Sequence, residues 1–598
     1  MKRSAILDLS LLRKRTRFFV LAPISLAVMA GCSGGARDEQ VSFVTSVDDC
    51  AASTKLSVTE CQAAYQQAVK DAEKTAPRYR NERDCQSEFG NCENRGGFFV
   101  PFMAGYIVSN IVSDSMGGNA RYRNSVPSYM YRGSGQFRNK IMTSDGFVVG
   151  SPGQNSYRVP REALKSKPAV TRTISRGGFG ASASAKSNWG SSRASTRSSS
   201  RSWGGSMLRV PCEERKNWEA MAEEFGFKFH TMFGEKYWDE SAYYQFSLAQ
   251  IEQGIETPTQ DIHQMCLSVV EHVVNSDELL TRFAIPESQW ALVRKSWQDG
   301  DPSLYSRLDF AYDGKGVAKL YENNADTPTS IYETGFWQWM WLENKVDSKM
   351  LGRHADQFNS LQKKLVNRFK ELQALTPDRC LHFACCKDTE EDRGTVQYLE
   401  DCATAAGIET KFVYIEDIGI DKDKQFADLE NNVITWMFKL YPWEFMFEDA
   451  YGELLGQQNI RWLEPPWKAI LSNKALLPML WKLFPEHPNL LPSFFEDELH
   501  LVPDDMLLVK KPIFSREGAN ISFTDARGNA LDENADSDGP YGEEGFIYQQ
   551  KHSLPQFDGN HKLIGSWLVD DQAAGISIRE DSQAITQDMS RYLPHVIY

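Results

Sequence analysis

Two short segments, Arg307-Leu308-Asp309-Phe310 and Leu320-Tyr321-Glu322-Asn323-Asn324-Ala325-Asp326, decide how the second part of this chain is interpreted. Apolar and polar residues alternate over much of both, which predicts two strands, and Asp313-Gly314-Lys315-Gly316 between them has the composition of a turn. Residues i and i+2 of a strand face the same side. Arg307 then shares a face with Asp309, and Glu322 with Asn324, so pairing of the strands brings together a guanidinium, two carboxylates and an amide.

This set of side chains has a definite chemistry. Carboxylate and amide oxygens suit Mg²⁺, and a guanidinium suits a phosphate or a carboxylate. A surface hairpin with one salt bridge is the alternative, and spacing alone leaves it open.

Three further segments have the pattern of strands with polar ends. The first is Leu507 to Ile513, in which apolar residues are followed by Lys510-Lys511-Pro512. A polar loop follows it, from Phe514 to Ile521. A lysine on a strand beside a loop with free backbone N–H groups can hold a triphosphate, although the Walker A pattern does not occur there. Gly545 to Gln550 could present backbone groups to a base, and Gly575 to Glu580 directs Arg579 away from its apolar residues. Ordinary core strands with solvated ends are the alternative for all three.

Charge divides the chain into two parts. The 598 residues carry a net charge of −14, but residues 1–206 hold 29 Lys and Arg against 15 Asp and Glu, a net of +14, and residues 207–598 carry −28. Such an asymmetry predicts a fusion of two unlike proteins. The hydrophobic share of 41 % excludes wholesale disorder.

The first 32 residues predict a lipoprotein signal peptide. A basic start precedes the 13 apolar residues from Phe18 to Ala30, which are too few to span a bilayer as an ordinary helix. Val28-Met29-Ala30-Gly31-Cys32 resembles a bacterial lipobox, so Cys32 is the expected lipidation site and the chain is expected to be anchored to a membrane. An ordinary anchor or a mis-assigned start is the alternative.

Cysteine usage separates the two parts again. Residues 33–110 form a Cys-bearing segment that contains Cys50, Cys61, Cys85 and Cys92. Four cysteines predict two disulfides and leave three possible pairings open. Six more are expected to be reduced thiols, without zinc spacing: Cys212, Cys266, Cys380, Cys385, Cys386 and Cys402. Residues 111–206 are rich in Gly, Ser and Arg and predict a disordered, low-complexity basic linker; no nucleic acid is expected as a partner.

The N-terminal part resembles an uncharacterised family of small bacterial lipoproteins with a Ser/Arg-rich tail. The resemblance rests on Asp48-Asp49-Cys50, Lys74-Thr75-Ala76-Pro77, Asp84-Cys85, Pro101-Phe102-Met103-Ala104-Gly105-Tyr106 and Arg176-Gly177-Gly178-Phe179-Gly180. It implies a location and no chemistry.

Residues 207–598 resemble the synthetase domain of glutathionylspermidine synthase, a member of the ATP-grasp superfamily. The motifs are Phe229-His230-Thr231-Met232, Ser303 to Asp309, Glu322 to Ser330, Leu463-Glu464-Pro465-Pro466-Trp467, Ser472 to Pro478 and Lys511-Pro512-Ile513. The resemblance implies an α/β (α+β) fold of ATP-grasp type over 207–598, behind the Cys-bearing segment and the linker.

The same resemblance implies the roles of single residues. ATP and Mg²⁺ are the implied cofactors. Asp309, Glu322 and Asn324 would bind Mg²⁺, and Arg307 would stabilise the acyl phosphate and the tetrahedral intermediate. The remaining implied contacts are Lys474, Lys511, Gln549, Gln550 and Arg579 for the nucleotide, and Arg307, Thr327, Thr329, Glu390 and Glu391 for the substrates.

The chain departs from the synthase at several of these positions. Thr327 and Thr329 stand where the synthase has Ser and keep the hydroxyl group. Leu440 aligns with a Thr of the glutathione pocket, and Leu563 aligns with a Gln near the nucleotide, so hydrogen-bonding groups are lost at both. Glutathione is therefore in doubt as the acid.

Two functions follow from this pattern. The first is an ATP-dependent carboxylate–amine ligase that forms an amide through an acyl phosphate, from a small-molecule or peptide-like acid and an amine such as a polyamine, which the acidic surface would suit. The second is a lipid-anchored cell-envelope protein whose ATP-grasp body is a non-catalytic scaffold. A lipobox exports the chain whereas ATP is cytoplasmic, so the ligase domain is expected in the cytoplasm if the signal is inefficient or the chain is cleaved.

Overall fold

The computed structural model divides the chain into two units, one of residues 181–412 and 435–598 and the other of residues 21–180 and 413–434. It describes residues 38–77, 82–95, 98–109, 125–132, 138–144, 147–154, 156–160, 164, 179, 207–232, 234–377, 379–387, 389–516, 518–531, 539–582 and 590–598. The expected signal peptide and Cys32 lie outside these residues. Within them, no helix is both long and apolar enough to cross a membrane.

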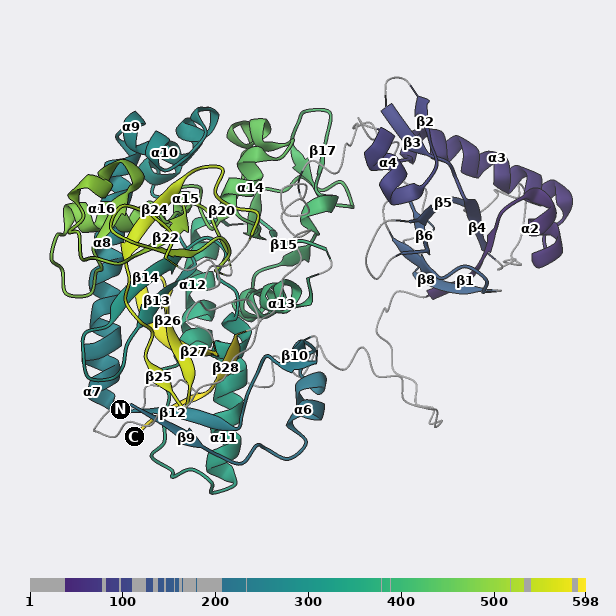
Figure 1. Ribbon diagram of the computed structural model, residues 1–598. Coiled ribbons are helices and arrows are strands. Elements are labelled where there is room, and N and C mark those ends of the chain that lie inside the picture. The colour runs from purple at the N-terminus through teal and green to yellow at the C-terminus, as the bar shows by residue number, and fades with distance from the viewer. Residues whose placement is uncertain are drawn as a thin grey trace. The chain divides into compact units, whose positions relative to one another are not determined.

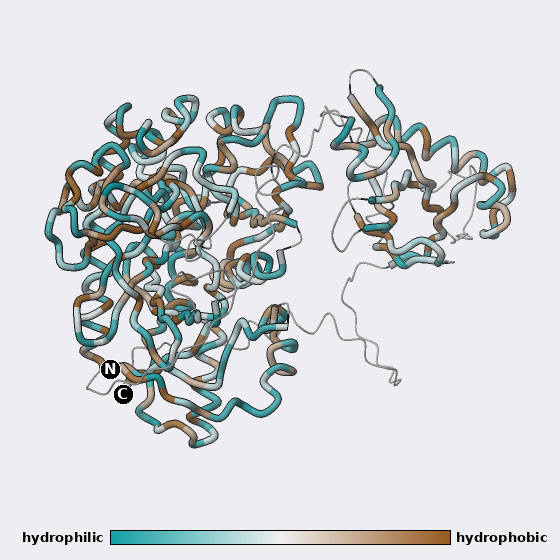
Figure 2. The backbone as a smooth tube through the Cα atoms, viewed as in Figure 1, coloured by the Kyte–Doolittle hydropathy of each residue, from teal (hydrophilic) through white to brown (hydrophobic). Residues whose placement is uncertain are grey.

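The N-terminal unit is built on an antiparallel sheet in the order β7-β6-β5-β4-β1-β8 (Figure 1). Its strands are β1 (Asp38–Val44), β4 (Gly105–Ser109), β5 (Val126–Tyr131), β6 (Lys140–Thr143), β7 (Val148–Gly150) and β8 (Tyr157–Pro160). Aliphatic side chains from β1, β4 and β8, among them Val41, Ile107 and Val159, are fully buried in its core. Figure 2 shows hydrophobic and hydrophilic positions interspersed along the chain of this unit.

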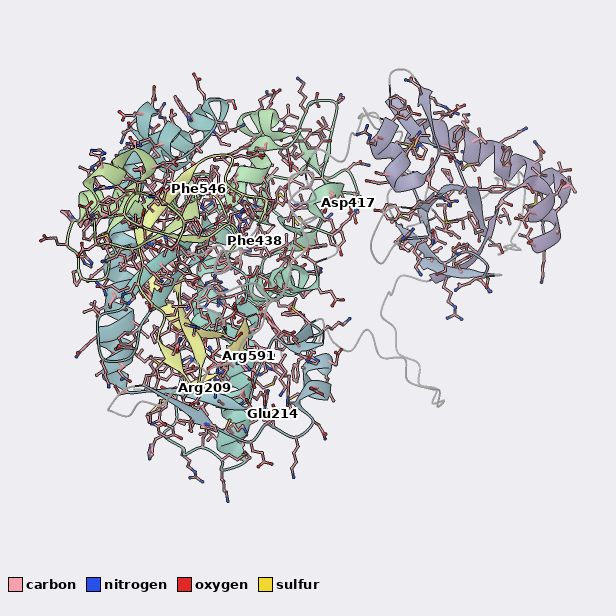
Figure 3. All side chains as sticks on the ribbon, viewed as in Figure 1. Arg209, Glu214, Asp417, Phe438, Phe546 and Arg591 are labelled. Carbon is pink, nitrogen blue, oxygen red and sulfur yellow. A yellow bond between two sulfur atoms is a disulfide. The ribbon has the colours of Figure 1, made fainter. Side chains whose placement is uncertain are left out.

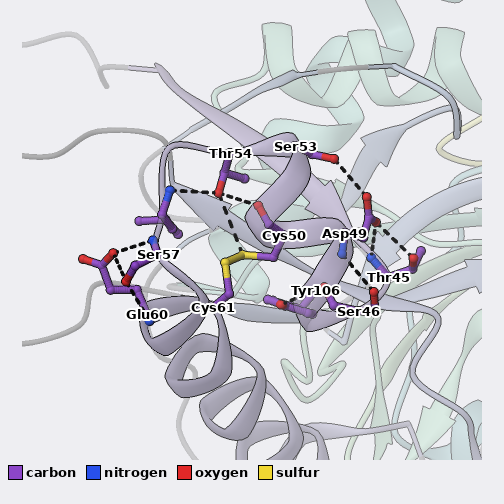
Figure 4. Close-up of a disulfide and its surroundings, with 11 residues drawn as sticks. Thr45, Ser46, Asp49, Cys50, Ser53, Thr54, Ser57, Glu60, Cys61 and Tyr106 are labelled. Carbon is purple, nitrogen blue, oxygen red and sulfur yellow. Dashed lines mark hydrogen bonds between the residues drawn. A yellow bond between two sulfur atoms is a disulfide. The ribbon is translucent and has the colours of Figure 1, made fainter.

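Three helices accompany this sheet, and two disulfides fix their ends. The helices are α2 (Val47–Ser53), α3 (Val58–Thr75) and α4 (Glu82–Phe89), and a hairpin of β2 (Cys92–Arg95) and β3 (Phe98–Pro101) follows. Cys50–Cys61 joins α2 to α3, and Cys85–Cys92 joins α4 to β2, which selects one of the three pairings that the sequence leaves open. Ser57 and Glu60 form a capping box at the start of α3, next to the first disulfide (Figure 4).

The expected linker over 111–206 is wrong for its first half. Strands β5, β6, β7 and β8 all lie within it, and their inward residues Val126, Ile141 and Val159 are buried. Polar residues dominate the stretch, but a strand needs only alternate apolar positions to bury one face. Most of residues 165–206 lie outside the described part; Phe179, which is described, packs edge-to-face on Phe426, with 5.3 Å between ring centroids.

The synthetase unit has a central antiparallel sheet in the order β14-β13-β26-β27-β28, with β25 beside β26. Its strands are β13 (Tyr305–Ala311), β14 (Lys319–Asn324), β25 (Gln556–Phe557), β26 (Asn560–Val569), β27 (Gln572–Asp581) and β28 (Arg591–Leu593). An ion pair joins this sheet to the start of the unit, because Arg209 contacts the buried Glu580 of β27 at 2.6 Å. Arg591 of the neighbouring strand β28 contacts the same carboxylate at 3.3 Å, and both arginines are labelled in Figure 3.

Three smaller sheets surround it. They are the antiparallel β21-β24-β22-β23, the parallel β16-β15-β19-β20, and β29-β12-β9. Their strands are β9 (Leu208–Pro211), β12 (Ala242–Phe246), β15 (Leu381–Cys385), β16 (Thr410–Phe412), β19 (Trp436–Leu440), β20 (Arg461–Leu463), β21 (Ser493–Phe495), β22 (Leu508–Pro512), β23 (Ser522–Thr524), β24 (Phe546–Gln550) and β29 (His595–Ile597). A short hairpin of this unit pairs β10 (Thr231–Met232) with β11 (Glu235–Lys236). Another pairs β17 (Gly419–Ile420) with β18 (Phe426–Ala427), within residues 413–434, which belong to the N-terminal unit.

Helices cover these sheets. They are α6 (Trp218–Glu224), α7 (Leu248–Ile251), α8 (Thr257–Val274), α9 (Asp277–Arg282), α10 (Trp290–Gln298), α11 (Gln338–Asp347), α12 (Leu361–Leu375), α13 (Glu390–Ala405), α14 (Trp443–Glu448), α15 (Lys468–Leu471) and α16 (Leu476–Leu483). Short π- or 3₁₀-turns are η2 (Glu252–Glu256), η3 (Glu287–Gln289), η4 (Glu333–Trp337), η5 (Ile415–Asp417), η6 (Gly452–Gln457) and η7 (Glu496–Leu501). Trp337, Trp339 and Trp341 are buried, as expected of a core.

Candidate active site

The hairpin that the sequence predicts is present. Strands β13 and β14 are antiparallel, and their register places Arg307 opposite Asn324 and Asp309 opposite Glu322. The Asn324 side-chain N–H group donates to Asp309 Oδ2 and to Glu322 Oε1, both at 3.2 Å. Asp309 is 1 % exposed, so this is a buried cluster and the alternative of a surface hairpin is wrong.

Arg307 is fixed inside this cluster. Its Nε donates to Asp309 Oδ1 at 2.7 Å, and one terminal N–H donates to the carbonyl oxygen of Thr329 at 3.1 Å. Gly565 on β26 makes room for it, because a Cβ atom there would lie 2.7 Å from Arg307 Cδ. The second cation on Asp309 is Arg579 of β27, whose terminal nitrogen lies 3.1 Å from Oδ2.

Two lysines face Glu322 from neighbouring elements. Lys474 Nζ is 3.0 Å from Glu322 Oε2, and Lys511 Nζ donates to the carbonyl oxygen of Tyr321 at 3.1 Å. Burial would raise the pKa of Glu322, but Lys474 and Lys511 outweigh it and hold that pKa well below its usual range. Burial lowers the pKa of Lys511 to about 8, because its ammonium group lacks water. Such a site favours an added anion.

Strand β24 supports one of these lysines. Gln549 accepts a hydrogen bond from Lys511 Nζ at 2.7 Å and donates to the carbonyl oxygen of Leu320 at 3.1 Å. Gln549 thus orients Lys511, and Gln550 lines the cavity beside it. The strand expected over 507–513 is present as β22, and β23 begins directly after the polar loop expected over 514–521.

The opposite wall combines hydroxyl groups with apolar side chains. Thr327 Oγ1 accepts a hydrogen bond from Arg516 at 2.8 Å, and Arg516 also donates to Glu444 at 2.7 Å. Leu440 and Leu563 line the same cavity. Arg516 is a site residue that the sequence did not predict. It lies in the 514–521 loop, which was expected to contribute backbone N–H groups and no side chain.

A second group of acids meets a tyrosine on this wall. Glu390 and Glu391 lie at the start of α13 and line the cavity. Tyr237 Oη lies 3.1 Å from Glu391 Oε1 and 2.7 Å from Oε1 of the fully buried Glu333. Neither Tyr237 nor Glu333 is signalled by a sequence motif, because the two meet only through the fold, across 96 positions of the chain.

All of these side chains except Glu333 and Glu444 border one cavity of about 800 Å³. Every sequence-predicted site residue of the synthetase part lines it: Arg307, Asp309, Glu322, Asn324, Thr327, Thr329, Glu390, Glu391, Lys474, Lys511, Gln549, Gln550 and Arg579. Five strands, two loops and a helix N-terminus therefore converge on one place.

The residues fit a magnesium-bound polyphosphate. The carboxylates of Asp309 and Glu322 and the amide of Asn324 supply the hard oxygen ligands that Mg²⁺ prefers. Two lysines and two arginines line the same cavity: Lys474, Lys511, Arg307 and Arg579. No group of three or more His, Cys, Asp or Glu that could hold a metal occurs among the described residues.

The synthetase unit is a mixed α/β fold whose cleft is lined by acidic, amide and basic side chains. The chain belongs to the glutathionylspermidine synthase family: the family described as "Glutathionylspermidine synthase preATP-grasp" matches residues 209–598. The N-terminal part belongs to a family of unknown function, DUF1190, which matches residues 38–190.

Individual relatives divide in the same way. A "Putative acid--amine ligase" of Haemophilus influenzae is 38 % identical and covers 62 % of this chain and 94 % of its own length. The "Bifunctional glutathionylspermidine synthetase/amidase" of Escherichia coli is 28 % identical over 60 % of each chain. A "UPF0441 protein" of Klebsiella pneumoniae is 35 % identical over 34 % of this chain and all of its own. Each part of the chain thus matches nearly the whole length of a separate relative, which supports the fusion predicted from charge.

Solved structures give a weaker likeness. A glutathione synthetase-like effector from Globodera pallida has a TM-score of 0.35 and 11 % identity, covering 59 % of this chain and 89 % of its own. A γ-glutamylcysteine synthetase, named as putative, from Methylobacillus flagellatus has a TM-score of 0.34 and 12 % identity, covering 55 % and 86 %. Both scores are too low to carry a conclusion.

Proposed function

We propose that the synthetase unit is an ATP-dependent carboxylate–amine ligase that forms an amide through an acyl phosphate. The observation that carries the proposal is the convergence of Asp309, Glu322 and Asn324 with Lys474, Lys511, Arg307 and Arg579 on one cavity. Family membership supports amide-forming ligation, since the relatives are named as ligases and synthetases.

The residues divide the chemistry between them. Mg²⁺, when bound, neutralises phosphate charge, and Asp309, Glu322 and Asn324 would hold it. Lys474 and Lys511 orient the phosphates, and Arg307 faces the transferring phosphoryl group and the carboxylate of the acid. A carboxylate is a poor electrophile, whereas its acyl phosphate, a mixed anhydride, is attacked readily by an amine, which displaces phosphate and yields the amide.

The two substrates are proposed from two different groups of residues that line the cavity. Thr327, Arg516 and Leu440 suit a peptide-like acid with an apolar portion, and Leu440 offers glutathione no hydrogen bond. Glu390 and Glu391 suit a cationic amine, and the −28 charge of residues 207–598 would attract a polyamine.

Phosphate release by the purified full chain tests the activity. With Mg²⁺ and ATP, a panel of small peptides that includes glutathione, combined with spermidine, putrescine and simple amines, is expected to yield one pair that raises phosphate release at least tenfold above ATP alone. The product mass should equal acid plus amine minus water.

The control is the variant Asp309→Asn, which keeps the size of the side chain but removes one ligand charge. It is expected to release no phosphate with that pair. If no pair stimulates release and calorimetry detects no binding of Mg–ATP, the chain is not a ligase and the scaffold function is supported instead.

We further propose that the two parts work in different compartments, by inefficient export or by cleavage. Among the described residues, the disulfides Cys50–Cys61 and Cys85–Cys92 both lie in the N-terminal unit, and disulfides persist in oxidising compartments outside the cytoplasm. Fractionation of cells that carry a chain tagged at both ends tests this. The C-terminal tag is expected in the cytosol and the N-terminal tag in the membrane fraction with Cys32, and a Cys32→Ser variant should release the N-terminal tag from that fraction. Intact chain found only in the membrane fraction would contradict the proposal.

A further inference from the structure

The proposed ligase must remove a proton from its amine, and a buried pair beside the cavity offers a place for it. We propose that Glu333, acting through the Tyr237 hydroxyl group and the cavity-lining Glu391, accepts the proton that an attacking ammonium group loses. This inference rests on the proposed function and adds a positioning residue to it.

The three groups form a continuous chain from the cavity to the core. Glu391 lines the cavity, and its Oε1 lies 3.1 Å from Tyr237 Oη. Tyr237 Oη lies 2.7 Å from Glu333 Oε1 on the other side. Glu333 is fully buried and does not border the cavity, and among the described residues its Oε2 has no hydrogen-bond partner. Tyr237 also lies 3.4 Å from Ser330 Oγ, but Ser330 donates its own hydrogen to Tyr592. Within the described part of the chain, the tyrosine is therefore the hydrogen-bond partner that links Glu333 to the cavity.

With both carboxylates ionised, the row Glu391–Tyr237–Glu333 has one hydrogen fewer than its two short contacts need to be hydrogen bonds. Tyr237 has a single hydroxyl hydrogen, but two carboxylate oxygens lie within hydrogen-bond distance of it. If both carboxylates are ionised, one oxygen faces the phenol without a hydrogen between them. Adding one proton to Glu333 lets its carboxyl group donate to Tyr237 Oη, which then donates to Glu391. The arrangement accordingly gains a hydrogen bond when it takes up a proton.

The surroundings place this proton uptake in the neutral range. Burial raises the pKa of Glu333 to about 7, against the lowering effects of Tyr237 and of Arg307 on β13. Burial and the two carboxylates keep the pKa of Tyr237 well above its ordinary value, so the phenol stays protonated and only relays. Tyr592 on β28 and Tyr332, next to Glu333 in the chain, complete the titratable groups that interact with this pair.

The step balances with the reactants already named. An N–H bond of the ammonium group breaks and its proton passes to Glu391, while the Tyr237 hydrogen moves to Glu333 and is replaced from Glu391. One O–H bond has then formed on Glu333 and the amine nitrogen has a free lone pair. That lone pair forms the C–N bond with the acyl phosphate, the C–O bond to phosphate breaks, and the second N–H proton leaves with the phosphate.

A comparison of two nucleophiles tests the relay in the full chain. Spermidine is protonated at pH 8 and needs a proton acceptor, whereas hydroxylamine is already neutral and does not. With Mg–ATP and the acids of the peptide panel, Glu333→Gln and Tyr237→Phe are expected to lower amide formation with spermidine about 100-fold at pH 8. Formation of the hydroxamate should stay within about threefold of the wild type, since acyl phosphate is still made.

The pH profile separates proton transfer from a structural defect. Free spermidine increases with pH, so the deficit of Glu333→Gln should shrink to below about tenfold near pH 9.5, while a misfolded site would stay impaired. The matched control is Tyr332→Phe, which removes the neighbouring buried hydroxyl group and its 3.1 Å bond to the Phe225 carbonyl oxygen without touching the cavity. It should leave both products unchanged.

Three outcomes would overturn the relay. Equal loss of amide and hydroxamate in Glu333→Gln, a deficit that does not change with pH, or wild-type behaviour of that variant would each do so. If the wild type makes neither product, the proposed function itself fails. Infrared spectra of the full chain then still test Glu333: the signal of a protonated carboxyl group should be present at pH 6, fade by pH 8, and be absent from Glu333→Gln.

Discussion

Replacing Lys511 with alanine is expected to weaken the binding of Mg–ATP at least 100-fold, or by about 2.7 kcal/mol. Lys511 is a buried cation, and it lies with Lys474 beside Glu322. Its pKa of about 8 shows how poorly the site compensates its charge before an anion binds. A triphosphate supplies that charge, so the lysine contributes far more to binding than an exposed one would.

Isothermal titration of the full chain with Mg–ATP measures this effect. The matched control is Lys510→Ala on the same strand. The Lys510 ammonium group lies over the Phe546 ring, 4.0 Å from its centroid, and does not border the cavity. Lys510→Ala should bind Mg–ATP as the wild type does. Equal affinities of Lys511→Ala and the wild type would remove Lys511 from the nucleotide site.

Replacing Arg307 with alanine is expected to lower turnover about 1,000-fold while ATP affinity changes only a few-fold. Arg307 is held by Asp309, by the Thr329 carbonyl oxygen and by contact with the Trp567 ring, 5.4 Å from its centroid. A guanidinium fixed in this way is oriented before the reaction, so it stabilises charge that develops on the transferring phosphoryl group. Asp309 keeps Arg579 as a partner in the variant, which preserves the acidic cluster.

Phosphate release with the active acid–amine pair gives turnover, and calorimetry gives ATP affinity. Arg368→Ala serves as the control, since Arg368 pairs with Asp570 at 2.6 Å and does not line the cavity. A loss of ATP affinity as large as the loss of turnover would show that Arg307 binds nucleotide in general and does not act on the transition state.

The sequence predicted the catalytic hairpin because its information is local. A period of two along 305–311 and 319–324 fixes which side chains share a face, and the turn residues between them make the strands antiparallel neighbours. Arg307, Asp309, Glu322 and Asn324 could therefore be placed together in advance. The strand ends at Lys511, Gln549 and Arg579 were predicted by the same pattern, and the resemblance to a family supplied their roles.

Other features depend on contacts between distant segments. Tyr237 and Glu333 are 96 positions apart, and Arg516 reaches Thr327 across 189 positions. No local pattern marks such pairs. The strands between 126 and 160 were missed for a related reason. This stretch has few apolar residues and therefore has the composition of a linker, and its apolar side chains are buried only because Val41 and Ile107 of other strands pack against them.

The sequence by itself determined the two-part composition, the family of the second part and the chemical set at the hairpin. Net charge, motifs and period-two alternation depend on residues that are near one another in the sequence, so they can be recognised without knowing the fold. Tertiary structure decided which cysteines pair, where the N-terminal unit ends, and that Glu333 lies behind Tyr237 and Glu391. These depend on burial and on distances across the fold, which arise only when remote elements exclude water from one another.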